Sequence, residues 1–161
     1  MVALNSKFDI LRGWPNSSAV QEDFVIGGTA THAHKQGMWV ILNTSNKDGS
    51  MVTADSLPTS TVAIRPSIII EGRDDYSSRF ANRVTCLLGG GYVVRIPQKG
   101  VDAEGGLYNC LAAAASTYAP GQLLEVTNGV LSAIDANEEV NAVGRVLAVD
   151  SNANTIDFLV I

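Results

Sequence analysis

The stretch "GQLLEVTNGVLSAID", residues 121–135, is the clearest indicator of the fold class. Leu123 and Val126 belong to a short apolar run of the kind that forms a β-strand. Asn128 and Gly129 follow as an Asn-Gly corner, which readily takes the positive φ angles of a tight hairpin turn. A second apolar run begins directly after this corner. The stretch therefore predicts a β-hairpin.

A second stretch with the same plan begins after Gly37, where the run "MWVILN" is followed by the polar corner "TSNKDGS" and then by "MVTAD". The segments that come next are also alike, because "STVAIRPSIIIEGRDD" and "VNAVGRVLAVDSNAN" are both apolar runs ending in acidic, turn-forming residues. Each is succeeded by a further strand candidate, "RVTCLLGGGYVVRIP" or "TIDFLVI". This pattern indicates an imperfect internal duplication of a small β-meander, with similar halves at residues 24–100 and 107–161.

Short apolar runs separated by Gly, Asn, Asp, Ser and Pro clusters continue along most of the chain. They predict an all-β fold, either a small β-barrel or a β-sandwich. The exception is "GGLYNCLAAAASTYAPGQ", whose alanines favour at most one short helix near residues 107–117. Residues 1–23 have no sustained periodicity, so we expect an irregular N-terminal arm before a β-rich domain at residues 24–161.

The composition limits the classes of function. With 161 residues, 46% of them hydrophobic, the chain has ample material for a folded core. The formal net charge is −5 and the eleven Lys and Arg residues are scattered, which argues against binding to nucleic acid through its phosphates. No apolar stretch reaches the roughly 18 residues of a membrane span, and the N-terminus lacks the apolar region of a secretion signal. We therefore expect a soluble, unexported chain that binds neither nucleic acid nor membrane.

His32 and His34 are the best candidates for metal ligands, because on an extended chain their imidazoles would point to the same side. The chain has no third histidine, so we expect two solvated side chains and no metal. Cys86 and Cys110 lie in different apolar segments, and neither is close in sequence to a histidine that would activate it. We expect two free, buried thiols.

Other candidate motifs also favour structural explanations. The adjacent pairs Asp74-Asp75 and Glu138-Glu139 would point to opposite faces of a strand, so neither forms the facing carboxylates of a glycosidase. The run Gly89-Gly90-Gly91 lacks the Gly-Lys-Ser/Thr ending of a phosphate loop and leads into a strand, which favours a bulge or a hairpin corner. The sequence also contains no Gly-x-Ser-x-Gly nucleophile elbow. It therefore predicts no catalytic residue, no cofactor and no enzymatic activity.

Two groups of large side chains remain as candidate interface residues. The N-terminal arm carries large apolar residues beside Gly13 and Pro15, which discourage self-contained structure. Such an arm either docks on a partner, as aromatic anchors do at interface centres, or folds back on its own domain. The second group lies between charged residues and either contacts a partner or packs in the core. The candidates are Phe8, Ile10, Leu11 and Trp14 in the arm, and Tyr76, Arg79 and Phe80 in the second group.

A family resemblance rests on the segments "YAPGQLLEV", "GVLSAI", "NAVGRVLAV" and "NTIDFLVI". Their glycine-initiated strand, Val-Gly-x-Val turn and terminal strand resemble the C-terminal half of capsid cement (head decoration) proteins of tailed bacteriophages. The preceding segments "QGMWVILN" and "AIRPSIIIEGRDDYSSRFANRVTCLLGGGYVVRI" resemble related small structural proteins found beside major capsid proteins. The resemblance covers residues 24–161 and consists of short β-patterns, whereas the N-terminal arm matches no pattern of that family.

The resemblance implies a non-enzymatic virion protein that binds the outer surface of the capsid lattice and stabilises the head. Its partner would be the major capsid protein, and it would be a homo-oligomer, a trimer or a dimer, made in the host cytoplasm and located on the capsid exterior. The alternatives are a fibre, tail or baseplate component, a carbohydrate-binding head appendage, and an enzyme with an unrecognised site. Paired aromatics along one groove would favour the carbohydrate binder, and a pocket of His, Asp and Glu from distant strands would favour the enzyme.

Overall fold

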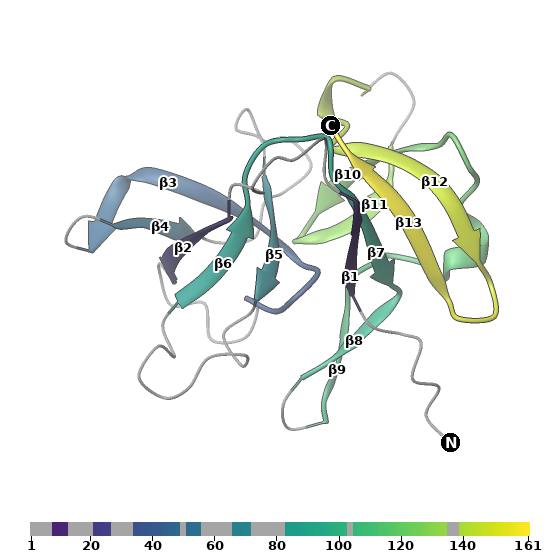
Figure 1. Ribbon diagram of the computed structural model, residues 1–161, viewed down its shortest axis with the longest axis horizontal. Coiled ribbons are helices and arrows are strands. Elements are labelled where there is room, and N and C mark those ends of the chain that lie inside the picture. Colours follow the sequence, from purple (N-terminus) through teal and green to yellow (C-terminus); the bar gives the residue numbers. More distant parts are fainter. Residues whose placement is uncertain are drawn as a thin grey trace.

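The computed structural model describes residues 8–12, 21–26, 34–48, 51–55, 66–71, 83–102, 105–134 and 139–161. This part of the chain is all-β, as predicted, and its two helical elements are three-residue 3₁₀ turns (Figure 1). In chain order the elements are β1 (Asp9–Arg12), β2 (Gln21–Ile26), β3 (Trp39–Asp48), β4 (Met51–Asp55), β5 (Ser67–Glu71), β6 (Arg83–Leu87), β7 (Val93–Pro97), β8 (Lys99–Val101), β9 (Leu107–Asn109), η3 (Ala115–Thr117), β10 (Leu123–Thr127), β11 (Val130–Ala133), η4 (Glu139–Asn141), β12 (Gly144–Asp150) and β13 (Thr155–Val160).

The first unit is a closed barrel with the strand order β2-β4-β3-β5-β6, at the left of Figure 1. Its neighbours are antiparallel except for β2 and β4, which run parallel. Strand β6 pairs back onto β2, so every strand of the barrel has two hydrogen-bonded neighbours. Among the described strands of the first unit, closure of this kind leaves no free edge.

The second unit is a six-stranded antiparallel sheet with the order β1-β7-β13-β12-β10-β11. Strands β1 and β11 are its edges. An isolated parallel bridge between Leu111 and Leu131 ties the chain before β10 to the edge strand β11. The outer edge of β11 is therefore paired at this one residue.

The two units repeat one topology. The order β4-β3-β5-β6-β2 in the barrel corresponds to β11-β10-β12-β13-β7 in the sheet. Their registers agree, because Ile69 pairs with Cys86 as Val146 pairs with Phe158. A β-bulge follows Ile69 in the first unit and Val146 in the second, directly after the matching pairs. A β-bulge has a defined position in a fold, so a bulge shared at the same position supports the structural equivalence of the two units.

The same correspondence extends to the strands that complete each unit. In the first, β4 receives a parallel contact from β2 at Ala54, which pairs with Ile26. In the second, the equivalent residue of β11 is Leu131, which is bridged in parallel by Leu111. The second contact is only a single bridge, because the hairpin β8–β9 is inserted in the chain before it.

Each of the two long hairpins begins after a glycine in the left-handed region. Gly37 has φ 83° and Gly121 has φ 90°, a backbone conformation that glycine adopts without steric cost. The N–H groups of Gly37 and Gly121 donate to the carbonyls of Ile69 and Val146, both at 2.8 Å. The N–H groups of Ile69 and Val146 in turn donate to the carbonyl of the residue after each glycine, Met38 or Gln122, at 2.8 and 2.9 Å. The predicted likeness of these two segments is therefore confirmed.

Matching positions also fill the two interiors. The inward side chains have different chemical identities in the two units but are all fully buried. They are Val40, Ile69, Val84 and Cys86 in the first unit, and Leu124, Val146, Ile156 and Phe158 in the second. Burial of apolar surface is the main favourable term in folding, so each unit has an interior of its own.

The units nevertheless share a core. Trp39, from the first unit, belongs to the same buried cluster as Phe158 of the second. Their rings meet edge to face, with centroids 6.3 Å apart and an interplanar angle of 89°. The backbone N–H of Trp39 also donates to the carbonyl of Gly129, in the turn of the second hairpin, at 3.0 Å. The two units are thus packed directly on each other.

The structure corrects the predicted boundaries. Strand β7, which the sequence placed in the first half, pairs with β13 and β1 and so belongs to the second unit. The units are therefore residues 21–87 and 93–160 rather than 24–100 and 107–161. The N-terminal arm expected at residues 1–23 is not irregular throughout, since β1 and the start of β2 lie within it.

The predicted helix near residues 107–117 shrinks to one 3₁₀ turn, and a second turn occurs at η4. Residues 107–109 form strand β9 instead. Alanine propensity is overridden because Ala112 donates its N–H to the carbonyl of Leu131 at 2.8 Å, which holds this segment against β11. Tertiary pairing therefore decides the conformation of the alanine-rich stretch.

Candidate functional site

The β8–β9 hairpin is the main feature of the second unit without a counterpart in the described part of the first. It projects away from both units in Figure 1. Its register pairs Lys99 with Asn109, Gly100 with Tyr108, and Val101 with Leu107. When only one of two repeats contains an additional element, that element can carry a binding site without altering the core of the fold. The hairpin is therefore the candidate site.

One face of the hairpin packs on the body of the protein. Gly100 is buried, and the Tyr108 ring lies so close that a Cβ at position 100 would come within 2.2 Å of it. The Tyr108 hydroxyl donates to the carbonyl of Gln36 at 2.9 Å, and the Gln36 amide donates to the carbonyl of Ile70 at 2.8 Å. Glycine is thus required for the tyrosine to reach the segment before β3.

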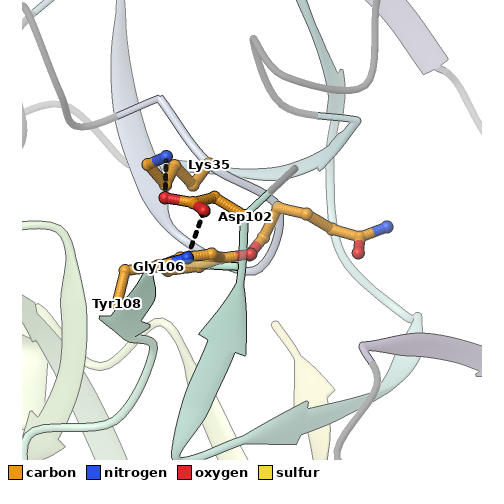
Figure 2. A network of polar contacts seen from close by, with 5 residues as sticks. Lys35, Asp102, Gly106 and Tyr108 are labelled. Carbon is orange, nitrogen blue, oxygen red and sulfur yellow. Dashed lines mark hydrogen bonds and ion pairs between the residues drawn. The ribbon is translucent and has the colours of Figure 1, made fainter. Parts of the chain in front are cut away.

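Charged groups fix the turn of the hairpin. The Lys35 ammonium pairs with the Asp102 carboxylate at 3.0 Å, and the same carboxylate accepts the N–H of Gly106 at 2.6 Å, as Figure 2 shows. The Lys35 nitrogen also lies 5.5 Å from the centroid of the Tyr108 ring, within cation–π range. Both charged side chains are largely buried, with relative exposures of 18% and 19%. The hairpin is therefore anchored to the body of the protein from both of its strands.

The opposite face of the hairpin is open to solvent. Val101 is 51% exposed and Leu107 is 67% exposed, and the two form a directly opposed cross-strand pair. Lys99 and Asn109 flank this pair on the same exposed face. Large apolar side chains exposed on an anchored, projecting element are typical of a protein-binding surface.

The sequence-predicted interface residues are only partly described. Phe8 is 8% exposed and belongs to the shared core, so this part of the arm folds back on the domain. Ile10 and Leu11 lie in β1, which pairs with β7 at the edge of the sheet, and Leu11 is half-buried. Trp14, Tyr76, Arg79 and Phe80 lie outside the described residues.

Sequence reasoning missed Val101 and Leu107, because Val101 lay in no candidate element and Leu107 began the alanine-rich stretch that suggested a helix. A usable signal was present in "KGVDAEGGLYN", where two alternating segments flank an Asp-x-x-Gly-Gly turn. Gly105 has φ 83°, and its N–H donates to the carbonyl of Asp102 at 3.0 Å, as a tight turn requires. The turn residues were therefore sufficient to predict this hairpin.

The other candidate residues have structural surroundings. His34 is buried rather than solvated, and His32, Asp74 and Asp75 lie outside the described residues. Glycines 89 to 91 are not a hairpin corner, because the strands before and after them pair with different partners and belong to different units. A Cβ at Gly90 would lie 2.8 Å from the carbonyl carbon of Ile161, so this link passes closely over the end of β13.

Both cysteines are free and buried, as predicted. Cys86 lies in the interior of the barrel and Cys110 in the shared core. Burial raises the pKa of the Cys110 thiol from 9.0 to about 12, an effect that a backbone hydrogen bond at Gly100 partly opposes. A thiol with this pKa stays protonated at neutral pH and is a poor nucleophile.

Among the described residues, no group of three or more His, Cys, Asp or Glu side chains is arranged to hold a metal ion. The same residues contain no helix with the length and apolar character of a membrane span. Comparison with protein-family models, curated proteins and solved structures finds no match to this chain.

Proposed function

We propose that this chain is a non-enzymatic structural protein of a tailed bacteriophage that binds the outer surface of the capsid lattice and stabilises the head. The observation that carries the proposal is the exposed pair Val101 and Leu107 on a hairpin that an ion pair and a hydrogen bond anchor to the body of the protein. The β-patterns that resemble head decoration proteins supply the identity of the partner, the major capsid protein. The alternative is another phage structural component or a carbohydrate-binding head appendage.

In this function the hairpin acts as a preformed contact. Binding loses least free energy when the contacting groups are already ordered, because little conformational entropy remains to be lost. The pairing of Lys35 with Asp102 and the hydrogen bond of Tyr108 to Gln36 provide this order. A capsid presents many equivalent sites, so a homo-oligomer gains avidity from modest contacts made by each copy.

The test measures attachment to capsids. Particles purified without this protein are mixed with the wild-type chain or with the double variant Val101→Asp/Leu107→Asp, and occupancy is counted by mass spectrometry and electron microscopy. We expect the variant to bind at least tenfold more weakly, because two apolar contacts are replaced by desolvated charges. Decorated particles should also rupture at a higher temperature than undecorated ones.

The control is Val140→Asp, which places one negative charge on a residue of η4 that is 89% exposed. Its occupancy should equal that of the wild type. Equal losses in both variants would show that negative charge, and not the hairpin, weakens attachment. A wild-type chain that fails to bind particles and is absent from purified virions would overturn the function itself.

A further inference from the structure

The turn between β10 and β11 contains an Asn-Gly dipeptide at the protein surface. Asn128 is exposed, and it is the only asparagine of the chain that a glycine follows. The side-chain carbonyl carbon of an asparagine can be attacked by the backbone nitrogen of the next residue. Glycine hinders this attack least, because it has no Cβ. The dipeptide is therefore a candidate for spontaneous covalent modification wherever the turn lets the two atoms meet.

The backbone of this turn is one peptide rotation away from the geometry of attack. Asn128 has φ 51° and Gly129 has φ 81°, the two positive values of a type I′ turn. Rotation of the peptide group that joins them gives a type II′ turn, in which the first residue keeps its positive φ and has ψ of about −120°. Tetrahedral geometry at Cα then aligns the Gly129 nitrogen with Asn128 Cβ. A five-membered ring can close from that nitrogen onto Asn128 Cγ.

This rotation breaks no hydrogen bond that the structure shows. Among the described residues, the Asn128 carbonyl and the Gly129 N–H form no hydrogen bond, and the Asn128 side-chain amide is likewise unbonded there. Thr127 and Val130, on either side of the turn, are paired with each other, as both turn types require. The reactive conformation is therefore accessible without unfolding of the hairpin.

Asn154, in the turn between β12 and β13, provides a comparison within the same unit. It also has a left-handed backbone, with φ 54°. Its side-chain oxygen, however, accepts the N–H of Ala115 at 2.8 Å, and its side-chain nitrogen donates to Gln98. The next residue is the β-branched Thr155, which is buried. Here the amide is fixed and the attacking nitrogen is hindered, so the structure distinguishes the two asparagines.

We propose that Asn128 deamidates spontaneously in the folded protein. The Gly129 backbone nitrogen loses its proton to hydroxide and forms a bond to Asn128 Cγ, the Cγ–Nδ2 bond breaks, and ammonia leaves. Water then opens the cyclic imide. Opening at Cγ gives aspartate, and opening at the main-chain carbonyl carbon of residue 128 gives isoaspartate. This reaction does not depend on the capsid function proposed above.

The isoaspartate product alters the junction between the two units. Its main chain runs through the former side-chain methylene, so the two-residue turn gains one backbone atom. Loop length and turn type fix the register of a hairpin, and the Gly129 carbonyl accepts the backbone N–H of Trp39 at 3.0 Å. The lengthened turn cannot keep both the register and this hydrogen bond. The aspartate product leaves the backbone unchanged.

The test follows each asparagine of the full chain during incubation at pH 7 and pH 9. Peptide mapping by mass spectrometry detects the replacement of an amide NH₂ by OH, and chromatography separates aspartate from isoaspartate. We expect Asn128 to lose its amide about tenfold faster than Asn154 or more. The loss should be faster at pH 9, because the attacking nitrogen must lose its proton. An Asn128 that is as stable as Asn154, or that reacts only when the chain is unfolded in urea, would overturn the proposal.

The variant Asn128→Asp separates the added charge from the added backbone atom. It carries the negative charge of both products but has the ordinary main chain. Urea unfolding should show a lower midpoint for the purified isoaspartate form than for Asn128→Asp. Equal midpoints would overturn the effect on the junction.

Discussion

At the scale of single residues, equivalent positions in the two units carry side chains of very different size. The interior position held by Cys86 in the first unit is held by Phe158 in the second. Trp39 of the first unit corresponds to Leu123 of the second. The two large aromatic side chains meet each other across the junction. Close packing requires total volume to be conserved, so this exchange keeps the core filled while the units diverge.

Cys110 makes the stability of the protein depend on pH. The folded-state pKa is about 12 and the ordinary value is 9.0, so the unfolded chain loses its thiol proton first as pH rises. The stabilisation is complete below pH 9 and is lost progressively between pH 9 and pH 12. Urea unfolding at pH 8 and pH 10 should show a loss of about 1.5 kcal/mol from this thiol.

The control for this prediction is Cys110→Ala, which lowers stability at both pH values because it removes buried volume. The difference between pH 8 and pH 10 should be smaller in the variant than in the wild type by the contribution of the thiol. If Cys110→Ala loses as much stability between pH 8 and pH 10 as the wild type, the loss arises from other groups. Tyr118 is one of them, because burial also raises its pKa.

Phe8 is expected to be a core residue rather than a docking anchor. It is 8% exposed and contributes to the shared core, so Phe8→Ala should lower the free energy of unfolding by about 3 kcal/mol. The half-buried Leu11 provides the comparison, and Leu11→Ala should cost less. Thermal unfolding of both variants measures the difference, and a near-neutral Phe8→Ala would restore the arm as a free docking segment.

At the scale of elements, the repeated feature is a hairpin that starts after a left-handed glycine and is fastened to the next strand by reciprocal backbone hydrogen bonds. The second hairpin also turns at Asn128 and Gly129, with φ 51° and 81°, as its sequence predicted. These local rules operate in both units although few side chains are shared. The element is therefore specified by turn chemistry and alternation more than by residue identity.

Gly37 and Gly121 form a matched pair that tests this equivalence. Alanine at either position should cost about 1 kcal/mol, because a side chain is strained at positive φ. Gly37→Ala should cost more, since its Cβ would lie 3.1 Å from the Cys110 sulfur, whereas Gly121 has open space around it. Chemical denaturation measures the free energy of unfolding of the two variants. Equal losses, or a larger loss in Gly121→Ala, would contradict the packing seen at Gly37.

At the scale of the whole molecule, the repeats are fused rather than independent. At the junction, the Trp39 ring contacts the Phe158 ring, and the Trp39 backbone N–H donates to the carbonyl of Gly129. In addition, β1, which precedes the barrel strands in the chain, pairs with β7, which follows them. Small β-units of this size bury too little surface to be strongly stable alone. The shared core therefore supplies stability that neither repeat has by itself.

Expression of the halves as separate chains tests this fusion. We expect residues 1–90 and residues 91–161 each to be largely unfolded alone, because each loses the shared core and one of the two paired strands β1 and β7. Mixing the two fragments should restore the amide spectrum of the intact protein. Two halves that each fold with the stability of the full chain would show that the junction contributes little.

The amino-acid order alone was enough to predict the all-β class, the hairpin at residues 121–135, the likeness of the segments after Gly37 and Gly121, and the burial of both free cysteines. These properties follow from alternation, turn residues and hydrophobicity, which act over a few neighbouring positions. Long-range contacts, by contrast, set the boundary between the units, the place of β7, the conformation of the alanine-rich stretch and the core position of Phe8. Each of these depends on pairing or packing between residues distant in the chain, and the energy of such contacts overrides local propensity.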